Sequence, residues 1–241
     1  MTENIEQRSD EWFAARCGSV GASQIFDVMA TTRSGTPTAG RSNLKAKLVI
    51  ERLTGTQEDG FKSAAMQWGI DQEPNARSAY EAHTGEFVAE VGLYCHPVID
   101  GTHASPDGLV NDDGLVEIKC PNSATHIETL KTGKIDRRYI LQMQWQMACV
   151  ERQWCDFVSF DPRMPLHLQL FVQRVERDDK LIQEIEAAVT EFLAEVAQDV
   201  EVLNKIQVAS RNFAEALLED QLNTAVACLV DSSENPKGDA Q

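Results

Sequence analysis

The sequence predicts an α/β protein in which a mixed central sheet lies between helices. Three observations carry this prediction: alternating strand patterns in the middle of the chain, an Asn-Asp-Asp-Gly turn at 111–114, and amphipathic helical patterns on both sides. A length of 241 residues with 42% hydrophobic residues is enough for one domain with a buried core. We expect a single domain over residues 1–230, with its core at about 5–200, a helical extension at about 179–230 and a disordered polar tail at 231–241.

The N-terminal third is predicted to be helical. Ser9 or Asp10 is a suitable N-cap for a first short helix, and Ser23 for a second one. A proline is tolerated only in the first turn of a helix, so Pro74 should lie near a helix start. The expected longer helices are Ser23–Ala30, Asn43–Leu53 before Gly55, and a helix that begins between Gly69 and Pro74 and reaches about His83.

The middle of the chain has strand patterns, and the last part is helical again. The 111–114 turn predicts a hairpin between two of the strands. An apolar stripe from Leu181 to Leu203 predicts a long amphipathic helix from about Asp179, and Phe213–Leu229 could be a separate helix. The expected strands are Phe87–Tyr94, Ala104–Val110, Leu115–Lys119, Trp154–Phe160 and Leu166–Val172, with a helix over Tyr139–Val150.

The composition indicates a cytoplasmic protein. No run of about 18 apolar residues is long enough to span a membrane, and the polar N-terminus lacks the apolar segment of a secretory signal. The six cysteines form no C-x-x-C pair and fit no zinc signature, so we expect free thiols in a reducing compartment.

The net charge of −16 argues against nucleic-acid binding, but the charge is unevenly distributed. Residues 176–241 hold 15 acidic and 5 basic side chains, a net charge of −10, which leaves −6 for residues 1–175. Two basic clusters could therefore contact DNA phosphates, although each could also be a solvated surface. They comprise Arg33, Arg41, Lys45 and Lys47 in the acid-free segment Val28–Ile50, and Lys131, Lys134, Arg137 and Arg138.

The segment around the predicted hairpin carries the candidate chemistry. On a strand over Leu115–Lys119, Glu117 and Lys119 project from one face while Val116 and Ile118 project from the other. The hairpin would bring Asp107 beside them. Two carboxylates repel each other, and a hard cation such as Mg²⁺ relieves the repulsion and can activate water for phosphodiester hydrolysis. The alternative is an exposed salt bridge between Glu117 and Lys119.

Together with other motifs, this segment resembles the PD-(D/E)xK nucleases, and more narrowly the phage lambda exonuclease family of viral alkaline exonucleases. The resemblance covers about residues 5–200. Its motifs are Arg16 with Gly18 and Ala22-Ser23; Trp68-Gly69 with Glu73 and Asn75-Ala76-Arg77; Ser105-Pro106-Asp107-Gly108-Leu109; Glu117-Ile118-Lys119-Cys120-Pro121; Tyr139 with Gln142 and Gln144; and Asp161-Pro162-Arg163-Met164.

The resemblance implies a Mg²⁺-dependent 5′→3′ exonuclease on double-stranded DNA ends. Two metal ions are expected, replaceable by Mn²⁺, with Asp107, Glu117 and the Ile118 carbonyl as ligands, and with Glu73 and Gln142 completing the active site. Arg16, Ser23 and Ser105 match a 5′-phosphate pocket, and Met66 matches an apolar wedge that parts the terminal base pair. Members of the family form homotrimeric rings and supply 3′ overhangs to a single-strand annealing protein.

Two other interpretations remain. An exonuclease with an iron–sulfur cluster would need about four grouped thiolates, whereas the cysteines are scattered. A non-catalytic acidic DNA mimic would fit the charge of −16 but would not need the Asp107, Glu117 and Lys119 triad.

Overall fold

The computed structural model describes residues 5, 7, 9–57 and 63–233, with side chains described up to residue 206. The chain divides into two compact units, Met1–Val196 and Ala197–Gln241. The expectation of one domain over residues 1–230, with a helical extension from about 179, stays a prediction. Most of the predicted tail at 231–241 lies outside the described residues.

A five-stranded mixed sheet forms the centre of the first unit, as predicted. Its order is β2-β5-β6-β7-β8, with β6 and β7 parallel and all other neighbours antiparallel. A second sheet has the order β1-β4-β3. The strands are β1 (Val20–Gly21), β2 (Val88–Ala89), β3 (Tyr94–Cys95), β4 (Thr102–Ala104), β5 (Gly108–Val110), β6 (Gly114–Lys119), β7 (Trp154–Phe160) and β8 (Leu170–Glu176).

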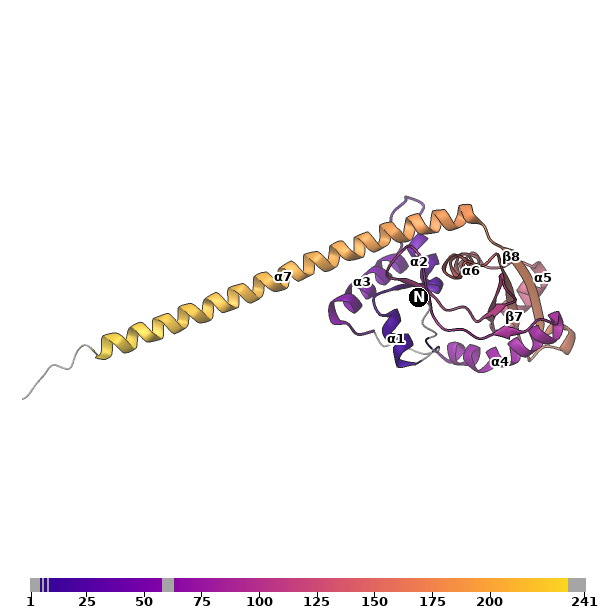
Figure 1. The fold of residues 1–241 in the computed structure, drawn as a ribbon, viewed down its shortest axis with the longest axis horizontal. Helices are drawn as coiled ribbons and strands as arrows, with labels where there is room; N and C mark the ends of the chain where they lie inside the picture. Colours follow the sequence, from indigo (N-terminus) through magenta and orange to yellow (C-terminus); the bar gives the residue numbers. More distant parts are fainter. Residues whose placement is uncertain (1–4, 6, 8, 58–62, 234–241) are drawn as a thin grey trace, which may run out of the picture. The chain divides into compact units, whose positions relative to one another are not determined.

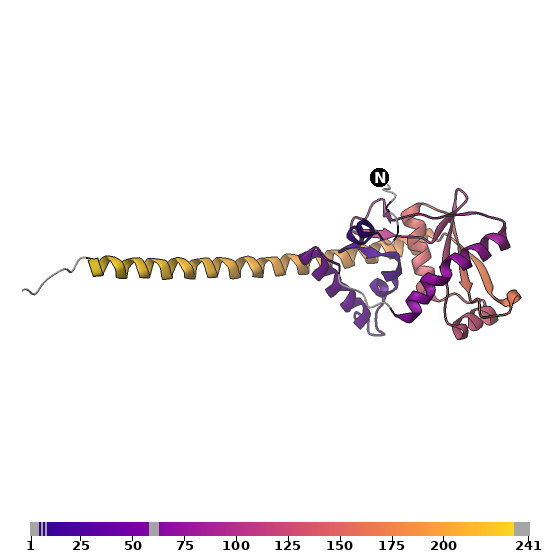
Figure 2. The ribbon, with the colours of Figure 1, turned by 90° about the horizontal axis from the view of Figure 1, so that it is seen from below.

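Two helices cover opposite faces of the larger sheet. Tyr80 of α4 (Ala64–Thr84) is buried in a cluster with Val116 and Ile118. Met143 of α6 (Arg137–Val150) is buried with Leu115 on the other face. Figure 1 shows α4 and α6 on opposite sides of β7 and β8, and in Figure 2 α4 runs diagonally across the strands. Burial of alternate residues of β6 against the two helices fixes which side chains point toward α6.

The N-terminal helices differ from the prediction in their starts. Ser9 caps α1 (Asp10–Arg16), as expected, through a 3.1 Å hydrogen bond from the Trp12 amide to its hydroxyl. Ser23 is not an N-cap: it lies inside the 3₁₀ helix η1 (Ala22–Gln24), which precedes α2 (Ile25–Met29). The side chain of Gln24 accepts a 2.8 Å bond from the Gly21 amide at the start of η1. Gln24, and not Ser23, is also the N-cap residue of α2, without a side-chain bond to that helix.

The predicted starts of the next two helices were also wrong. α3 (Ala39–Thr54) begins at the N-cap Thr38 rather than near Asn43. α4 begins five residues before the predicted Gly69, because Ser63 caps it with a 3.2 Å bond from the Met66 amide. Pro74 therefore lies inside α4. The buried contacts of this helix with the sheet compensate for the hydrogen bond that proline cannot donate.

Three features of the second half of the chain differ from the prediction. Helix α5 (Ser123–Thr132) was not expected, although Asn122 caps it. The last strand of the sheet begins at Leu170 instead of Leu166, because Leu166–Leu168 forms a 3₁₀ helix, η2. Residues beyond Asp179 form one helix, α7 (Asp179–Ser233), so Phe213–Leu229 is not a separate helix.

Candidate active site

The β5–β6 hairpin brings Asp107 to the strand that carries Glu117 and Lys119. Asp107 Oδ2 accepts a 2.7 Å hydrogen bond from the Ile118 amide. Val116 and Ile118 lie in the core under α4, whereas Leu115, which shares a face with Glu117 and Lys119, packs under α6. The prediction that Glu117 and Lys119 share one face of this strand, opposite Val116 and Ile118, is therefore confirmed.

Helix α6 holds both carboxylate oxygens of Glu117. Gln142 Nε2 donates to Oε1 at 2.6 Å, and Gln146 Nε2, one turn later, donates to Oε2 at 2.6 Å. Lys119 Nζ forms an ion pair with Oε1. Glu117 is 1% exposed, so these contacts replace water as the partners of its charge.

Gln146 is the residue of this site that the sequence analysis missed. Its spacing of four from Gln142 places the two amides on one face of a helix, and that spacing was the available signal. The family resemblance identifies Gln142. It does not identify Gln146, which the sequence pattern does not distinguish from the other residues on the buried face of α6. The side chain of Gln146 is fully buried, so only the packed structure shows that it faces Glu117.

The electrostatics of the site are those of a buried carboxylate pair beside one ammonium group. Burial, and then the neighbouring charge of Glu117, raise the pKa of Asp107 well above its usual value, against the opposing effect of Lys119. Burial would lower the pKa of Lys119, but the carboxylates of Glu117 and Asp107 outweigh it and raise that pKa. Lys119 therefore stays protonated, and its ammonium group is the positive charge that acts on both carboxyl groups.

The donor set at the hairpin suits a hard divalent cation. Asp107 and Glu117 offer carboxylate oxygens, and the carbonyl of Ile118 comes from the residue after Glu117. Mg²⁺ is usually held by one or two carboxylates. Within the described part of the chain, no cluster of three or more His, Cys, Asp or Glu side chains forms a metal site. Glu73 is close enough to raise the pKa of Asp107, but it forms a 3.2 Å ion pair with Arg77.

The cysteines whose side chains the structure describes do not form a cluster site. The five whose side chains are described, Cys17, Cys95, Cys120, Cys149 and Cys155, are all free. Two of them, Cys149 and Cys155, are buried in the core, where burial raises the pKa of each thiol. These thiols act as small apolar side chains, which counts against the iron–sulfur interpretation.

The residues that match a 5′-phosphate pocket lie around the β1–β4 pair. These strands are parallel with Gly21 opposite His103, so Ser23 and Ser105 each follow the pair by two residues. Trp12 Nε1 donates to the hydroxyl of Ser105 at 3.0 Å, and the Arg16 guanidinium lies 3.7 Å from the Trp12 ring centre. Trp12 thus connects Arg16 to Ser105, a contact that the sequence did not indicate.

Arg16 combines a charge with an unused donor. Burial lowers the pKa of Arg16 to about 10, although Glu51 opposes the shift. Its Nε is buried and has no hydrogen-bond partner among the described residues. A buried guanidinium with a free N–H is suited to an anionic oxygen.

Met66 lies in the first turn of α4 and is 57% exposed. A large apolar side chain at this position has no core to pack into. It is therefore available to contact a base, in accordance with the wedge expectation, which stays a prediction.

The basic residues expected to contact DNA have different surroundings. Arg41 donates to both carboxylate oxygens of Glu195 on α7 at 2.8 and 2.9 Å, and Lys45 Nζ lies 3.9 Å from Glu195. These two cations would therefore have to weaken an ion pair in order to bind phosphate. Arg33 is exposed in the segment between α2 and α3.

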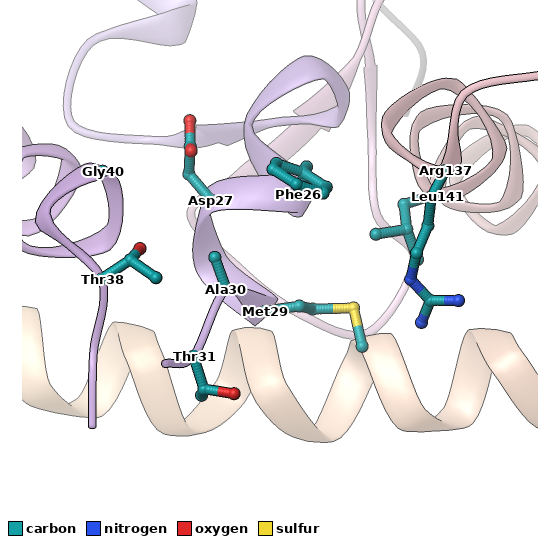
Figure 3. Close-up of a pocket in the computed structure, with 9 residues that line it drawn as sticks. All are labelled: Phe26, Asp27, Met29, Ala30, Thr31, Thr38, Gly40, Arg137 and Leu141. Atoms are coloured by element: carbon teal, nitrogen blue, oxygen red, sulfur yellow. The ribbon is translucent and has the colours of Figure 1, made fainter. Parts of the chain in front are cut away.

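Arg137 begins α6 and lines an open pocket of about 490 Å³ together with Met29 of α2. In Figure 3 the guanidinium of Arg137 points toward the sulfur end of the Met29 side chain. Thr38 and Gly40 line the other side of the pocket. This position would let Arg137 contact a phosphate without breaking an ion pair.

Among the helices that the structure describes, none combines the length and the apolar character needed to cross a bilayer.

Comparisons with known proteins agree with the geometry. A family model described as the YqaJ-like viral recombinase domain matches residues 11–153, which is more than half of the chain. The crystal structure of an alkaline exonuclease, LHK-Exo, from Laribacter hongkongensis is 56% identical over 82% of this chain and 97% of that chain, with a TM-score of 0.77. The same values hold for LHK-Exo in complex with dAMP.

A more distant structure supports the fold alone. The phage-related exonuclease from Haemophilus somnus 129PT is 16% identical over 77% of this chain and 96% of that chain, with a TM-score of 0.62. No curated protein is significantly similar to the chain.

Proposed function

The chain belongs to the YqaJ-like viral recombinase family, which contains exonucleases of the lambda type, and from this premise we propose that it is a Mg²⁺-dependent 5′→3′ exonuclease on double-stranded DNA ends. The observation that carries the proposal is the arrangement of Glu117, held on both oxygens beside Asp107 and Lys119. The 56% identity to an alkaline exonuclease supports the nuclease activity.

The chemistry follows from the charges in the site. Asp107, Glu117 and the Ile118 carbonyl would hold one or two Mg²⁺ ions, which Mn²⁺ can replace. When bound, the metal polarises the phosphate and lowers the pKa of a water molecule. Gln142 and Gln146 keep the Glu117 carboxylate from rotating, and Glu73 adds negative charge near Asp107. Lys119 stabilises the negative charge that develops on the phosphate oxygens.

The proposed product explains why a 5′-phosphate pocket belongs in the site. Water attacks the phosphorus between the first and second nucleotides, and the bond from phosphorus to the 3′ oxygen of the first nucleotide breaks. That oxygen takes a proton, so a 5′-mononucleotide leaves, and the shortened strand keeps a new 5′-phosphate. Arg16, Ser23 and Ser105 would bind this group before each cycle, because Arg16 has a free buried N–H beside Trp12 and Ser105.

Assembly and partners extend the proposal. Degradation of one strand would leave a 3′ single-stranded overhang for a single-strand annealing protein in phage-type recombination, in the cytoplasm of a bacterial host. In a homotrimeric ring, Arg33 and Arg137 would line a shared channel. Arg41 and Lys45 would line it as well if DNA phosphates replaced Glu195 as their partner. A closed ring also prevents threaded DNA from leaving sideways.

Duplexes labelled at either end test the activity and its polarity. With Mg²⁺, the wild-type chain should release a 5′ label at once as a mononucleotide and a 3′ label only late. EDTA should abolish release, and Asp107→Asn should lower both Mg²⁺ affinity and activity. Early loss of the 3′ label, or equal activity in EDTA, would contradict the proposal.

A further inference from the structure

One buried histidine beside the proposed phosphate pocket has an unused ring nitrogen. His103 lies in β4 and is 3% exposed. Its Nδ1 is 2.8 Å from the hydroxyl of Ser19. Its Nε2 is buried and has no hydrogen-bond partner among the described residues.

The free nitrogen lies against Gly21, two residues before the pocket residue Ser23. His103 is opposite Gly21 in the parallel β1–β4 pair, and a Cβ atom at Gly21 would lie 2.7 Å from Nε2. Only glycine leaves room for the ring at this position. Ser23 and Ser105 each follow this residue pair by two positions, so both serine segments continue from the two residues that meet at Nε2.

Arg16 provides a second unused donor in the same neighbourhood. Its Nε is also buried without a partner, and its charge acts on the imidazole. Burial, and then the charge of Arg16, lower the pKa of His103 to about 3. The ring is therefore neutral near pH 7 and carries one proton. If the Ser19 hydroxyl donates to Nδ1, that proton is on Nε2.

A comparison inside the chain separates this histidine from one with a structural role. His126 is equally buried, and its Nδ1 is also 2.8 Å from a serine hydroxyl, that of Ser159. Its Nε2, however, bonds to the Leu168 carbonyl at 2.8 Å. Buried polar groups normally have such a partner, so the free Nε2 of His103 calls for one from outside the chain.

We propose that His103 is a ligand of the terminal 5′-phosphate: its Nε2–H donates to a phosphate oxygen beside the Arg16 guanidinium, and Ser19 fixes the tautomer. An anionic oxygen accepts from both nitrogens without needing a proton of its own. The inference rests on the proposed function, because it adds a residue to the 5′-phosphate pocket.

Two substitutions in the full-length chain test the role of the ring nitrogens. His103→Gln keeps an amide nitrogen near the Nε2 position, whereas His103→Asn keeps an atom only near Nδ1. The quantity measured is the ratio of kcat/KM for 5′-phosphorylated over 5′-hydroxyl duplex ends. His103→Asn should lower this ratio about tenfold, mainly through KM, since hydrogen bonds to charged groups are the stronger ones. His103→Gln should retain more of the ratio.

His126→Asn is the matched control, because it removes a buried imidazole that bonds a serine in the same way. It should lower stability and leave the ratio at the wild-type value. A wild-type ratio in His103→Asn overturns the role of His103 while leaving the proposed function intact. A wild-type enzyme that does not distinguish the two ends overturns the phosphate pocket itself, and this inference with it.

A measurement on the wild-type chain covers the case in which His103→Asn does not fold. With ring-¹⁵N-labelled histidine and no added metal, a 5′-phosphorylated duplex should shift the Nε2 resonance of His103, and the 5′-hydroxyl duplex should not. An unchanged resonance with the phosphorylated duplex overturns the proposal.

Discussion

Gln146 donates a 2.6 Å hydrogen bond to Oε2 of Glu117, although 29 residues separate them in the chain. Gln146 lies on α6 and Glu117 on β6, so the contact depends on how the helix packs on the sheet. Together with Gln142, it fixes the plane of the carboxylate that we assign to the metal.

Gln146→Leu should therefore weaken metal binding by about 10–100-fold, the usual effect of losing a group that orients a metal ligand. Titration calorimetry with Mg²⁺ measures this directly. Gln144→Leu is the control, because the neighbouring Gln144 bonds to the Glu176 carbonyl instead of Glu117. Equal metal affinity in Gln146→Leu and wild type would show that Gln142 and Lys119 alone position Glu117.

Lys119→Ala should bind duplex DNA and lose hydrolysis by about 10²–10³-fold or more, because it removes the positive charge beside the reacting phosphate. Single-turnover rates and equilibrium binding measure the two effects separately. Lys205→Ala, which changes an exposed lysine paired with Glu201 on α7 and outside both basic clusters, should behave as wild type. Near-normal hydrolysis by Lys119→Ala would exclude Lys119 from the reaction.

Met66→Ala should slow resection more on GC-rich than on AT-rich duplexes, because an apolar side chain that parts the terminal pair matters more when that pair is stable. Rates on duplexes matched in length measure the difference. Val98→Ala, a change at an exposed apolar residue of the β3–β4 connection, serves as the control. Slowing by the same factor on both duplexes would contradict a role of Met66 in parting the terminal base pair.

Asp161 should make stability depend on acid pH. Its buried carboxylate accepts bonds of 3.0 and 2.7 Å from the Arg163 amide and guanidinium. Burial would raise the pKa of Asp161, but these bonds and one from Ser123 outweigh it and lower the pKa to about 2. Because the folded-state pKa is below the unfolded value of about 4, the stabilisation is complete above pH 4 or so and is lost as the pH falls through about 2.

Asp161→Asn should remove this part of the pH dependence. Urea denaturation midpoints at a series of pH values should fall more steeply between about pH 4 and pH 2 for wild type than for the variant. Asp112→Asn, in the exposed hairpin turn, should keep the wild-type slope. Parallel curves for wild type and Asp161→Asn would contradict the assignment.

The chain should form a homotrimer that degrades one DNA molecule through many cycles. A monomer of charge −16 is repelled by DNA at long range, and a closed ring would gather the basic residues around one channel. Light scattering coupled to size exclusion measures the mass, which should be three times that of the chain, and a heparin trap measures processivity. A monomer that dissociates after a few nucleotides would rule out this assembly.

The sequence by itself determined the parts of the site that depend on local geometry. Side chains two apart on a strand share a face, so the alternation at Leu115–Lys119 was enough to place Glu117 and Lys119 together. The turn at 111–114 was enough to predict the hairpin that returns Asp107 to them. These relations involve residues close in the chain, and the backbone conformation alone enforces them.

Only the tertiary structure decided the contacts that join distant segments. Gln146 on Glu117, Trp12 on Ser105 and Arg41 on Glu195 each depend on the packing of separate elements. Local rules also failed where packing or a neighbouring side chain outweighed them, as at Pro74 inside α4 and at Gln24, which replaced Ser23 as the cap. The physical reason is that helix propensities differ by less than about 1 kcal/mol for most residues, and by about 3 kcal/mol for an interior proline. The burial of several apolar side chains exceeds either amount.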